Sequence, residues 1–371
     1  MTEDNQIPFL DLKAQFAGIR EELLGALHRV VESQNFILGP EVEAFEDELA
    51  DYIGTRYAVG VASGTDALIL TLRSLGLRPG DEVITTPYTF FSTVSAIVLA
   101  GGKPVFADIV PQTFNLDPEK IKDVISERTR AILPVHLFGQ CADMKPILDI
   151  ARQRGLFVLE DAAQAMGAGY QGRKAGAIGD AGALSFYPSK ILGAFGDAGM
   201  VVTDQEETFR KIHQLRIHGS RYAKDYNTLG VNSRLDSIQA AVLRVKLRYL
   251  KNWISARQEI ARTYDQLFHE SPVKTPKVSD QCEHVFNSYV VRVKRRDELV
   301  SHLKGKGIGC AVYYPVPLYL MSCFSAFAPF AGLPEAEKAA GECLALPIYP
   351  EMTRSQLERV ASAVLEFLEG T

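Results

Sequence analysis

The sequence has few cysteines and no long apolar run, and both absences exclude classes of protein. Its five cysteines are odd in number and include no Cys-x-x-Cys pair, so neither a disulfide framework nor a zinc site is predicted. No uncharged run approaches the ~20 apolar residues that a membrane-spanning helix needs. Residues 1–6 are acidic and polar where a secretory signal would be basic and then apolar. We therefore expect a cytoplasmic protein with no membrane partner and no metal.

An excess of positive charge is missing as well. The 371 residues carry a net charge of −5, and the Lys and Arg residues are scattered along the chain. This pattern argues against a nucleic-acid partner, and any phosphate must be recognised at a local site. With 47% apolar residues and this length, the chain is predicted to form one large domain and a smaller lobe.

Short apolar runs alternate with helical patterns between residues 58 and 203, the rhythm of a mostly parallel sheet with helices on both faces. The predicted strands are 57–62, 82–86, 104–108, 131–135, 157–160, 183–186 and 200–203. One long helix is predicted over 236–270. The C-terminal part predicts a strand at 288–293, a helix at 297–306, a strand near 308–313 and a closing helix at 353–368. We expect an α/β fold, with a large domain of residues 1–250 around a seven-stranded sheet and a small α/β domain of residues 251–371.

A lysine follows the predicted strand that ends near residue 186. The segment Ser-Phe-Tyr-Pro-Ser-Lys (185–190) leaves the sheet through a proline, and a glycine-rich loop follows Lys190. A desolvated lysine has a lowered pKa, and its neutral amine can form a Schiff base with an aldehyde cofactor. An ordinary exposed lysine is the alternative for this segment taken alone.

An acidic pair ends the predicted strand at 157–160. Ligands of open α/β sheets lie just outside the carboxyl ends of the strands, which is where Asp161 falls. A carboxylate there can pair with a pyridinium nitrogen, and Gln164 can donate to the phenolic oxygen of the same ring. The alternative is that Asp161 only caps the following helix.

Two further strand ends carry candidate cofactor contacts. Residues 62–68 place Gly64 and Thr65 at a helix N-terminus, where free amides and a hydroxyl group can bind a phosphate. Tyr88, in the aromatic segment 87–91, can stack on a planar ring. Each motif has an ordinary structural alternative, but together they predict a phosphate site, a stacking ring, a carboxylate and a lysine at one edge of one sheet.

These motifs in this order resemble the DegT/DnrJ/EryC1/StrS family of sugar aminotransferases. The resemblance covers nearly the whole chain, through residues 8–12, 36–41, 62–68, 160–164, 185–190, 230–236 and 313–317. It implies the aspartate-aminotransferase fold (fold type I) and pyridoxal 5′-phosphate (PLP) as cofactor.

The resemblance also implies a role for each matching residue. Lys190 is the catalytic residue that holds PLP as a Schiff base, and Asp161 pairs with the pyridine nitrogen. The other implied cofactor contacts are Gln164 at the ring hydroxyl, Tyr88 stacked on the ring, Gly64, Thr65 and Ser185 at the phosphate, and Asn232 at the phosphate of the neighbouring subunit. Asn232 therefore implies a homodimer with shared active sites. Arg234, Tyr313, Tyr314 and Tyr187 are candidate substrate contacts, and Arg234 suits a carboxylate or phosphate.

The implied reaction moves an amino group from L-glutamate to a nucleotide-linked keto-sugar, for an amino sugar of a lipopolysaccharide or an antibiotic. Asn-Ser-Arg-Leu-Asp at 232–236 and Tyr-Pro-Val-Pro at 314–317 resemble members that aminate C3 of a 3-keto-hexose or 3-keto-hexuronate. Those members often have His where this chain has Tyr313. Amination at C4 of a 4-keto-6-deoxyhexose is the alternative, and a non-catalytic regulator on the same fold is an alternative of another class. Relatives that dehydrate replace the lysine with histidine, so Lys190 favours transamination.

Overall fold

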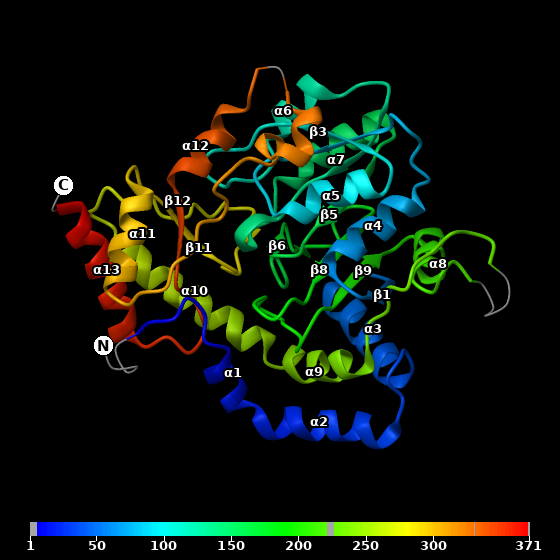
Figure 1. Cartoon of the computed structure of the whole chain (residues 1–371), viewed down its shortest axis with the longest axis horizontal. Helices are drawn as coiled ribbons and strands as arrows, with labels where there is room; N and C mark the ends of the chain where they lie inside the picture. The colour runs from blue at the N-terminus through cyan, green and yellow to red at the C-terminus, as the bar shows by residue number, and fades with distance from the viewer. Residues whose placement is uncertain (1–5, 221–225, 330, 370–371) are drawn as a thin grey trace.

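The computed structural model describes residues 6–220, 226–329 and 331–369 (Figure 1). Its central sheet has seven strands in the order β1-β9-β8-β5-β4-β2-β3. β9 runs antiparallel to both of its neighbours, and the other neighbouring strands are parallel. The predicted α/β fold with a mostly parallel sheet is confirmed. The strands are β1 (Tyr57–Val61), β2 (Glu82–Thr85), β3 (Lys103–Phe106), β4 (Thr129–Leu133), β5 (Phe157–Asp161), β8 (Ala181–Ser185) and β9 (Gly199–Thr203).

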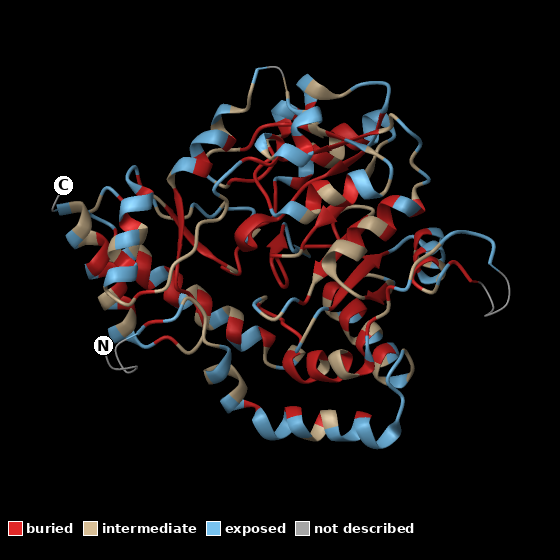
Figure 2. Cartoon of the chain, in the orientation of Figure 1, coloured by how far each residue is buried: buried red, intermediate tan, exposed pale blue. Residues whose placement is uncertain are grey.

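Both faces of the sheet are buried, because successive side chains of a strand point to opposite faces. In β4, Ile132 belongs to one hydrophobic core while Ala131 and Leu133 belong to the other. Figure 2 shows the strands and the inner sides of the surrounding helices as buried. The first core contains residues of α3 (Pro40–Ile53), α7 (Met144–Arg154) and α9 (Ser237–Leu247), and the second contains residues of α4 (Gly64–Ser74), α5 (Phe91–Leu99) and α8 (Glu206–Leu215).

The C-terminal part has a hydrophobic core of its own. It is formed by α10 (Leu250–Leu267), β11 (Tyr289–Arg292), α11 (Arg296–Gly305), β12 (Cys343–Leu346) and α13 (Arg354–Glu369). The strand predicted at 288–293 and the helices predicted at 297–306 and 353–368 are confirmed. In Figure 1 these elements lie beside the large sheet, with α10 leading toward it. We propose that the start of α10, at Leu250, is the junction of the two predicted domains.

The helix predicted over 236–270 is wrong as one element, because it is divided into α9 and α10. Arg248 and Tyr249 form the turn between them. Val245 of α9 packs on α2 (Arg20–Ser33), whereas Tyr264 of α10 packs in the C-terminal core. Since the two halves bury their apolar faces against different cores, one straight helix cannot serve both.

The strand predicted near 308–313 is also corrected. This segment has only isolated bridges, from Ile308 to Ile7 and from Ala311 to Ala345. Its last residue, Tyr313, has a carbonyl that accepts a hydrogen bond from the hydroxyl of Tyr88. The backbone therefore leaves the pairing with β12 in order to reach the large sheet, where it lines the cavity described below.

The remaining elements are short or lie at the periphery. No described helix is both long and apolar enough to span a lipid bilayer. β10 (Cys282–Glu283), β6 (Gly169–Tyr170) and β7 (Arg173–Lys174) form a small sheet. The other described α-helices are α1 (Leu12–Gly18), α6 (Pro118–Val124) and α12 (Pro334–Glu342), and short 3-10 helices occur at Leu137–Gly139, Leu318–Leu320 and Ser322–Phe327.

Candidate active site

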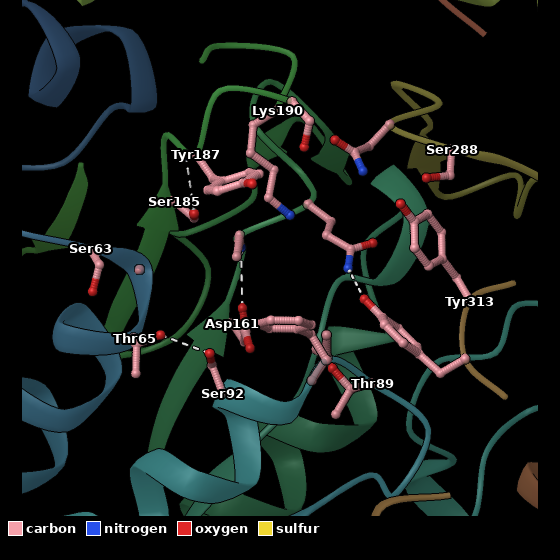
Figure 3. A pocket seen from close by; sticks show the side chains of 18 of the residues that line it. Ser63, Thr65, Thr89, Ser92, Asp161, Ser185, Tyr187, Lys190, Ser288 and Tyr313 are labelled. Carbon is pink, nitrogen blue, oxygen red and sulfur yellow. Dashed lines mark hydrogen bonds between the residues drawn. The ribbon is translucent and has the colours of Figure 1, made fainter. Parts of the chain in front are cut away.

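A cavity of about 930 Å³ lies at the carboxyl edge of the central sheet, and most of the predicted site residues line it. β1, β8, β5, β4 and β2 point in one direction, so the residues that follow them meet at the same edge. The cavity wall includes Gly64, Thr65, Asp161, Gln164, Ser185, Tyr187, Lys190, Tyr313 and Tyr314. Figure 3 shows how the labelled members of this set surround one space.

Lys190 extends into this cavity from the loop after β8, toward Asp161 (Figure 3). The loop is held by its own backbone: the amide of Lys190 donates to the carbonyl of Tyr187 over 2.8 Å, and the amide of Ala194 donates to the carbonyl of Phe186 over 2.8 Å. Burial lowers the pKa of the Lys190 amine to about 8, and attraction to Asp161 opposes that shift. Such an amine is available in its neutral, nucleophilic form near physiological pH.

Asp161, the last residue of β5, is a buried carboxylate with two fixed donors. Thr93 Oγ1 donates to Oδ2 over 2.8 Å, and the amide of Ala163 donates to Oδ1 over 3.2 Å. Burial raises the pKa of this carboxyl, whereas these donors and Lys190 lower it. A carboxylate held in this way can hold a positive charge in the cavity, which is what a protonated ring nitrogen needs.

Gln164 links Asp161's loop to the segment 313–314. Its Nε2 donates to the hydroxyl of Tyr314 over 2.8 Å, and its Oε1 accepts from the amide of Phe138 over 3.1 Å. Burial raises the pKa of the Tyr314 hydroxyl. This hydroxyl therefore stays protonated and can donate to a ligand in the cavity while it accepts from Gln164.

The predicted phosphate site lies at the N-terminus of α4. Ser63 caps the helix by accepting from the amide of Asp66 over 3.1 Å, and Thr65 Oγ1 lies 2.7 Å from Ser92 Oγ. The first amides of a helix have no carbonyl partner within it, so they remain available to an anion. Ser185 closes this site from the neighbouring strand, because a Cβ on Gly64 would lie 2.6 Å from the Cβ of Ser185.

Replacement of Gly64 by alanine is expected to weaken phosphate binding and to destabilise the fold. The added methyl group must displace Ser185 or α4, at a cost of about 1–3 kcal/mol. Titration of the apo-protein with PLP and urea unfolding measure the two effects. Gly341→Ala is the control, since a Cβ there meets nothing within 4 Å. Equal PLP affinity in the Gly64 variant and the wild type would contradict this role.

The stacking role predicted for Tyr88 is corrected. Its ring is completely buried, packs near Phe114 and Phe138, and does not line the cavity. A ring enclosed on all sides has no free face for a cofactor. Its hydroxyl instead donates to the carbonyl of Tyr313 over 2.6 Å and accepts from the amide of Tyr314 over 3.1 Å. Phe90, two residues further on, lines the cavity and presents the aromatic surface that segment 87–91 was expected to supply.

We expect Tyr88→Phe to weaken binding of the keto-sugar substrate while PLP binding is retained. The substitution leaves the amide of Tyr314 unpaired, which costs about 1–3 kcal/mol, and loosens segment 313–314. Steady-state kinetics and PLP titration separate the two effects. Tyr264→Phe is the matched control, because this buried hydroxyl bonds the carbonyl of Pro347 over 3.0 Å in the C-terminal core. Unchanged kinetics in Tyr88→Phe would contradict the role of this hydroxyl in holding segment 313–314.

Two predicted site residues lie outside the cavity of their own chain. Asn232 is exposed, Arg234 is half-buried, and neither lines the cavity. Ser233, between them, is held at the N-terminus of α4. Its Oγ donates to Asp66 over 2.8 Å and accepts from the amide of Ala62 over 3.2 Å. The single chain therefore does not bring Asn232 or Arg234 to Lys190.

Several cavity residues were missed in the sequence. Ser92 lies in the first turn of α5, and Arg257, Asn287 and Ser288 come from the C-terminal part; Thr93, next to Ser92, is buried behind the wall and contacts Asp161. Their segments carry no local motif, so only the fold brings them to the cavity.

Glu160, beside Asp161, has a structural role. Its carboxylate bonds His136 over 2.7 Å and three amides of the segment 176–179.

The groups around the cavity fit PLP. An amine of lowered pKa, a buried carboxylate and a helix N-terminus with two hydroxyl groups match its aldehyde, its ring nitrogen and its phosphate. Among the described residues, no group of three or more His, Cys, Asp or Glu side chains could hold a metal ion. Fold and site together define a PLP-dependent enzyme of the aspartate-aminotransferase class.

The comparisons with known proteins identify the family. The model of the DegT/DnrJ/EryC1/StrS aminotransferase family matches residues 18–365. The chain belongs to this family of PLP-dependent aminotransferases, so the predicted family, enzyme class and cofactor are confirmed.

Three relatives and one solved structure show how close the similarity is. The chain is 46% identical to a "pleiotropic regulatory protein" of Geobacillus stearothermophilus, over 97% of this chain and 98% of the relative. It is 44% identical to dTDP-3-amino-3,4,6-trideoxy-alpha-D-glucose transaminase of Streptomyces venezuelae (99% and 97%). Identity to UDP-N-acetyl-3-dehydro-alpha-D-glucosamine 3-aminotransferase of Acidithiobacillus ferrooxidans is 40% over the full length of both chains. The crystal structure of S. venezuelae DesV in complex with a ketimine intermediate superposes with a TM-score of 0.95 at 44% identity, covering 98% of this chain and 99% of that chain.

Proposed function

We propose that this enzyme transfers the amino group of L-glutamate to C3 of a nucleotide-linked 3-keto-sugar. The observation that carries the proposal is the position of Lys190, whose amine of lowered pKa points toward the buried Asp161 in a cavity that is large enough for a sugar. The names of the two sugar-acting relatives given above place the amino group at position 3 of the sugar. The product would be an amino sugar for a surface polysaccharide or an antibiotic, made in the cytoplasm.

The side chains divide the chemistry among themselves. When bound, PLP supplies an electron sink and carries the amino group between the two substrates. Lys190 Nζ, in its neutral form, takes a proton from the α-carbon of the amino donor, and in the second half-reaction it delivers a proton to C3 of the sugar. Asp161 supplies the negative charge that balances a protonated ring nitrogen, and Gln164 and Tyr314 orient the ring. We propose Gly64, Thr65 and Ser185 as the phosphate ligands.

Three tyrosines form the proposed sugar side of the cavity. Tyr187 is 55% exposed, so its ring is accessible beside Lys190. Tyr313 packs edge-on against Phe9, with ring centroids 6.0 Å apart, and Tyr314 follows it. An aromatic wall of this kind suits the apolar faces of a hexose.

A panel of UDP- and dTDP-linked 3-keto and 4-keto sugars tests the proposal. Each sugar is incubated with the PLP enzyme and glutamate, and NMR locates the new amino group. We expect an amine at C3. An amine at C4, as in the 4-keto-6-deoxyhexose alternative, would overturn the proposed position and leave the enzyme class intact.

A regulatory role is the second candidate, because one relative is named a pleiotropic regulatory protein. The same cavity residues argue for catalysis, since a regulator has no need of an amine of lowered pKa beside a buried carboxylate. Spectral conversion of the bound cofactor by glutamate distinguishes the two. A protein that binds PLP but never converts it would favour regulation.

We also propose a homodimer in which Asn232 and Arg234 of one subunit complete the cavity of the other. Asn232 is exposed, and the nearby side chain of Leu229 is 92% exposed, as expected of a surface that a partner covers. Arg234 would then supply the cation for a phosphate or carboxylate of the sugar nucleotide.

Mixed dimers test this arrangement. We expect Lys190→Ala and Asn232→Ala proteins to be nearly inactive alone and to regain activity when they are unfolded together and refolded. One of the two sites in a mixed dimer then has both native residues, so up to about a quarter of wild-type activity returns. No recovery in mixed dimers that are shown by mass to form would contradict shared sites.

A further inference from the structure

The C-terminal wall of the cavity contains a buried arginine that none of the proposed steps uses. Arg257, on α10, is 3% exposed and lines the cavity together with Asn287, Ser288 and Ile348. Its Nη1 donates to the carbonyls of Phe286, over 3.2 Å, and Ile348, over 2.8 Å. These two bonds fix the guanidinium against the wall, next to Asn287.

The rest of this guanidinium lacks partners. Its Nε is buried without a hydrogen bond, and Nη2 forms none with the described residues. Glu351 attracts it through space, but no carboxylate of the described chain lies within ion-pair distance. Burial lowers the pKa of Arg257 to about 10, so it remains charged at neutral pH. A buried cation without a contacting anion is costly unless a ligand supplies that anion.

Among the charged residues of the cavity wall, one cation remains for an anion other than the cofactor phosphate. The charged residues of its wall are Asp161, Lys190, Asp197 and Arg257. Lys190 is taken by the cofactor, and the two aspartates repel an anion. In Figure 3, Ser288 lies across the cavity from Ser63 and Thr65, with Lys190 between them. Ser288, which lines the cavity together with Arg257, is thus on the far side of the amine from the phosphate site.

An amino donor must place its α-carbon at Lys190, and it carries a carboxylate beside that carbon. A guanidinium offers a planar pair of donors that matches a carboxylate. The side-chain amide of Asn287 and the hydroxyl of Ser288 form no hydrogen bonds within the described chain, so both are free to add a donor.

We propose that Arg257, assisted by Asn287 and Ser288, is the subsite that binds a carboxylate of the amino donor. The inference rests on the proposed function, because it assigns the place of the donor in the same cavity. It also separates the two substrates: the donor is held by residues of its own subunit, whereas the sugar nucleotide depends on Arg234 of the neighbouring subunit.

The test compares donor binding with sugar binding in Arg257→Lys, which keeps the charge and loses the paired donors. Stopped-flow absorbance of the PLP enzyme gives the Kd for glutamate, and steady-state kinetics give the KM for the keto-sugar. We expect the Kd for glutamate to rise at least about tenfold, the effect of losing one hydrogen bond to a charged group. The KM for the sugar is expected to change less than about twofold. Glutarate, which has carboxylates and no amine, should compete with glutamate in the wild type and bind more weakly to the variant.

Arg296→Lys is the matched control. Arg296 is 7% exposed and also donates through Nη1 to two backbone carbonyls, those of Ala340 and Cys343, each over 3.1 Å, but it does not line the cavity. It should lose comparable stability and keep the glutamate Kd. If Arg257→Lys fails to fold, Ser288→Ala carries the test, with an expected rise of about threefold or more in the same Kd.

The outcomes separate this inference from the proposed function. A wild-type enzyme that glutamate does not convert would overturn the proposed donor itself. A wild type that is converted, together with folded Arg257 and Ser288 variants that bind glutamate and glutarate normally, would overturn the subsite alone. Equal losses for glutamate and for the sugar would also overturn it, because they would indicate a general disturbance of the cavity.

Discussion

Lys190→Ala is expected to lower the rate of transamination by about 10⁴-fold, the largest effect of any single substitution. The amine both holds the cofactor and moves the proton in each half-reaction, and positioned proton transfer alone contributes about 10²–10⁴-fold. The rate of cofactor conversion by glutamate measures the loss. Borohydride reduction followed by peptide mass analysis should find the cofactor on Lys190 in the wild type and on no lysine in the variant.

Lys190→Arg shows whether charge or nucleophilicity is essential. Arginine keeps a positive charge opposite Asp161 but stays protonated, so it can neither form the covalent link nor accept a proton. We expect it to be as inactive as the alanine variant while the fold is retained. Activity within about tenfold of wild type in either variant would contradict the assignment of Lys190 as the catalytic residue.

Asp161→Asn is expected to reduce the rate by about 10²–10³-fold, the scale of losing one preorganised electrostatic group. The asparagine oxygen can still accept from the amide of Ala163 or from Thr93, so the local structure is kept while the negative charge is lost. Without that charge the ring nitrogen loses its proton, and the ring becomes a poorer electron sink. Single-turnover kinetics with glutamate measure the effect.

Asp180→Asn is the control for this substitution. Asp180 precedes β8, where its Oδ2 accepts from the amide of Val158 over 2.7 Å at the opposite end of β5 from Asp161. It should lower stability without changing the rate of cofactor conversion. Equal rates in Asp161→Asn and wild type would show that the carboxylate does not act on the cofactor.

The sequence predicted the strand ends best. Asp161, Ser185 and Lys190 follow apolar runs that β-strands bury on both faces, and parallel strands must bring their carboxyl ends to one edge. The periodicity of the chain therefore placed these side chains together before any contact was known. The motif at 62–68 could be predicted in the same way, because it joins a strand end to a helix N-terminus.

Predictions failed where side-chain packing decides the outcome. Tyr88 lies in the predicted segment, yet its ring turns into the core and its hydroxyl holds residues 313 and 314. The pattern at 236–270 reads as one helix because it is amphipathic throughout, although two cores divide it. Neither fact is local in the chain, since each depends on which segment packs opposite.

By itself, then, the sequence determined where the strands end and which side chains follow them, because alternating and helical periodicities and helix caps are local properties, and its ordered motifs identified the family by resemblance. Only the tertiary structure decided that Phe90 rather than Tyr88 faces the cavity and that Arg257 reaches its wall. Arg257 lies on α10 and is fixed by carbonyls of residues 286 and 348. Contacts over such separations arise from the packing of the C-terminal core on the sheet, and no local pattern encodes them.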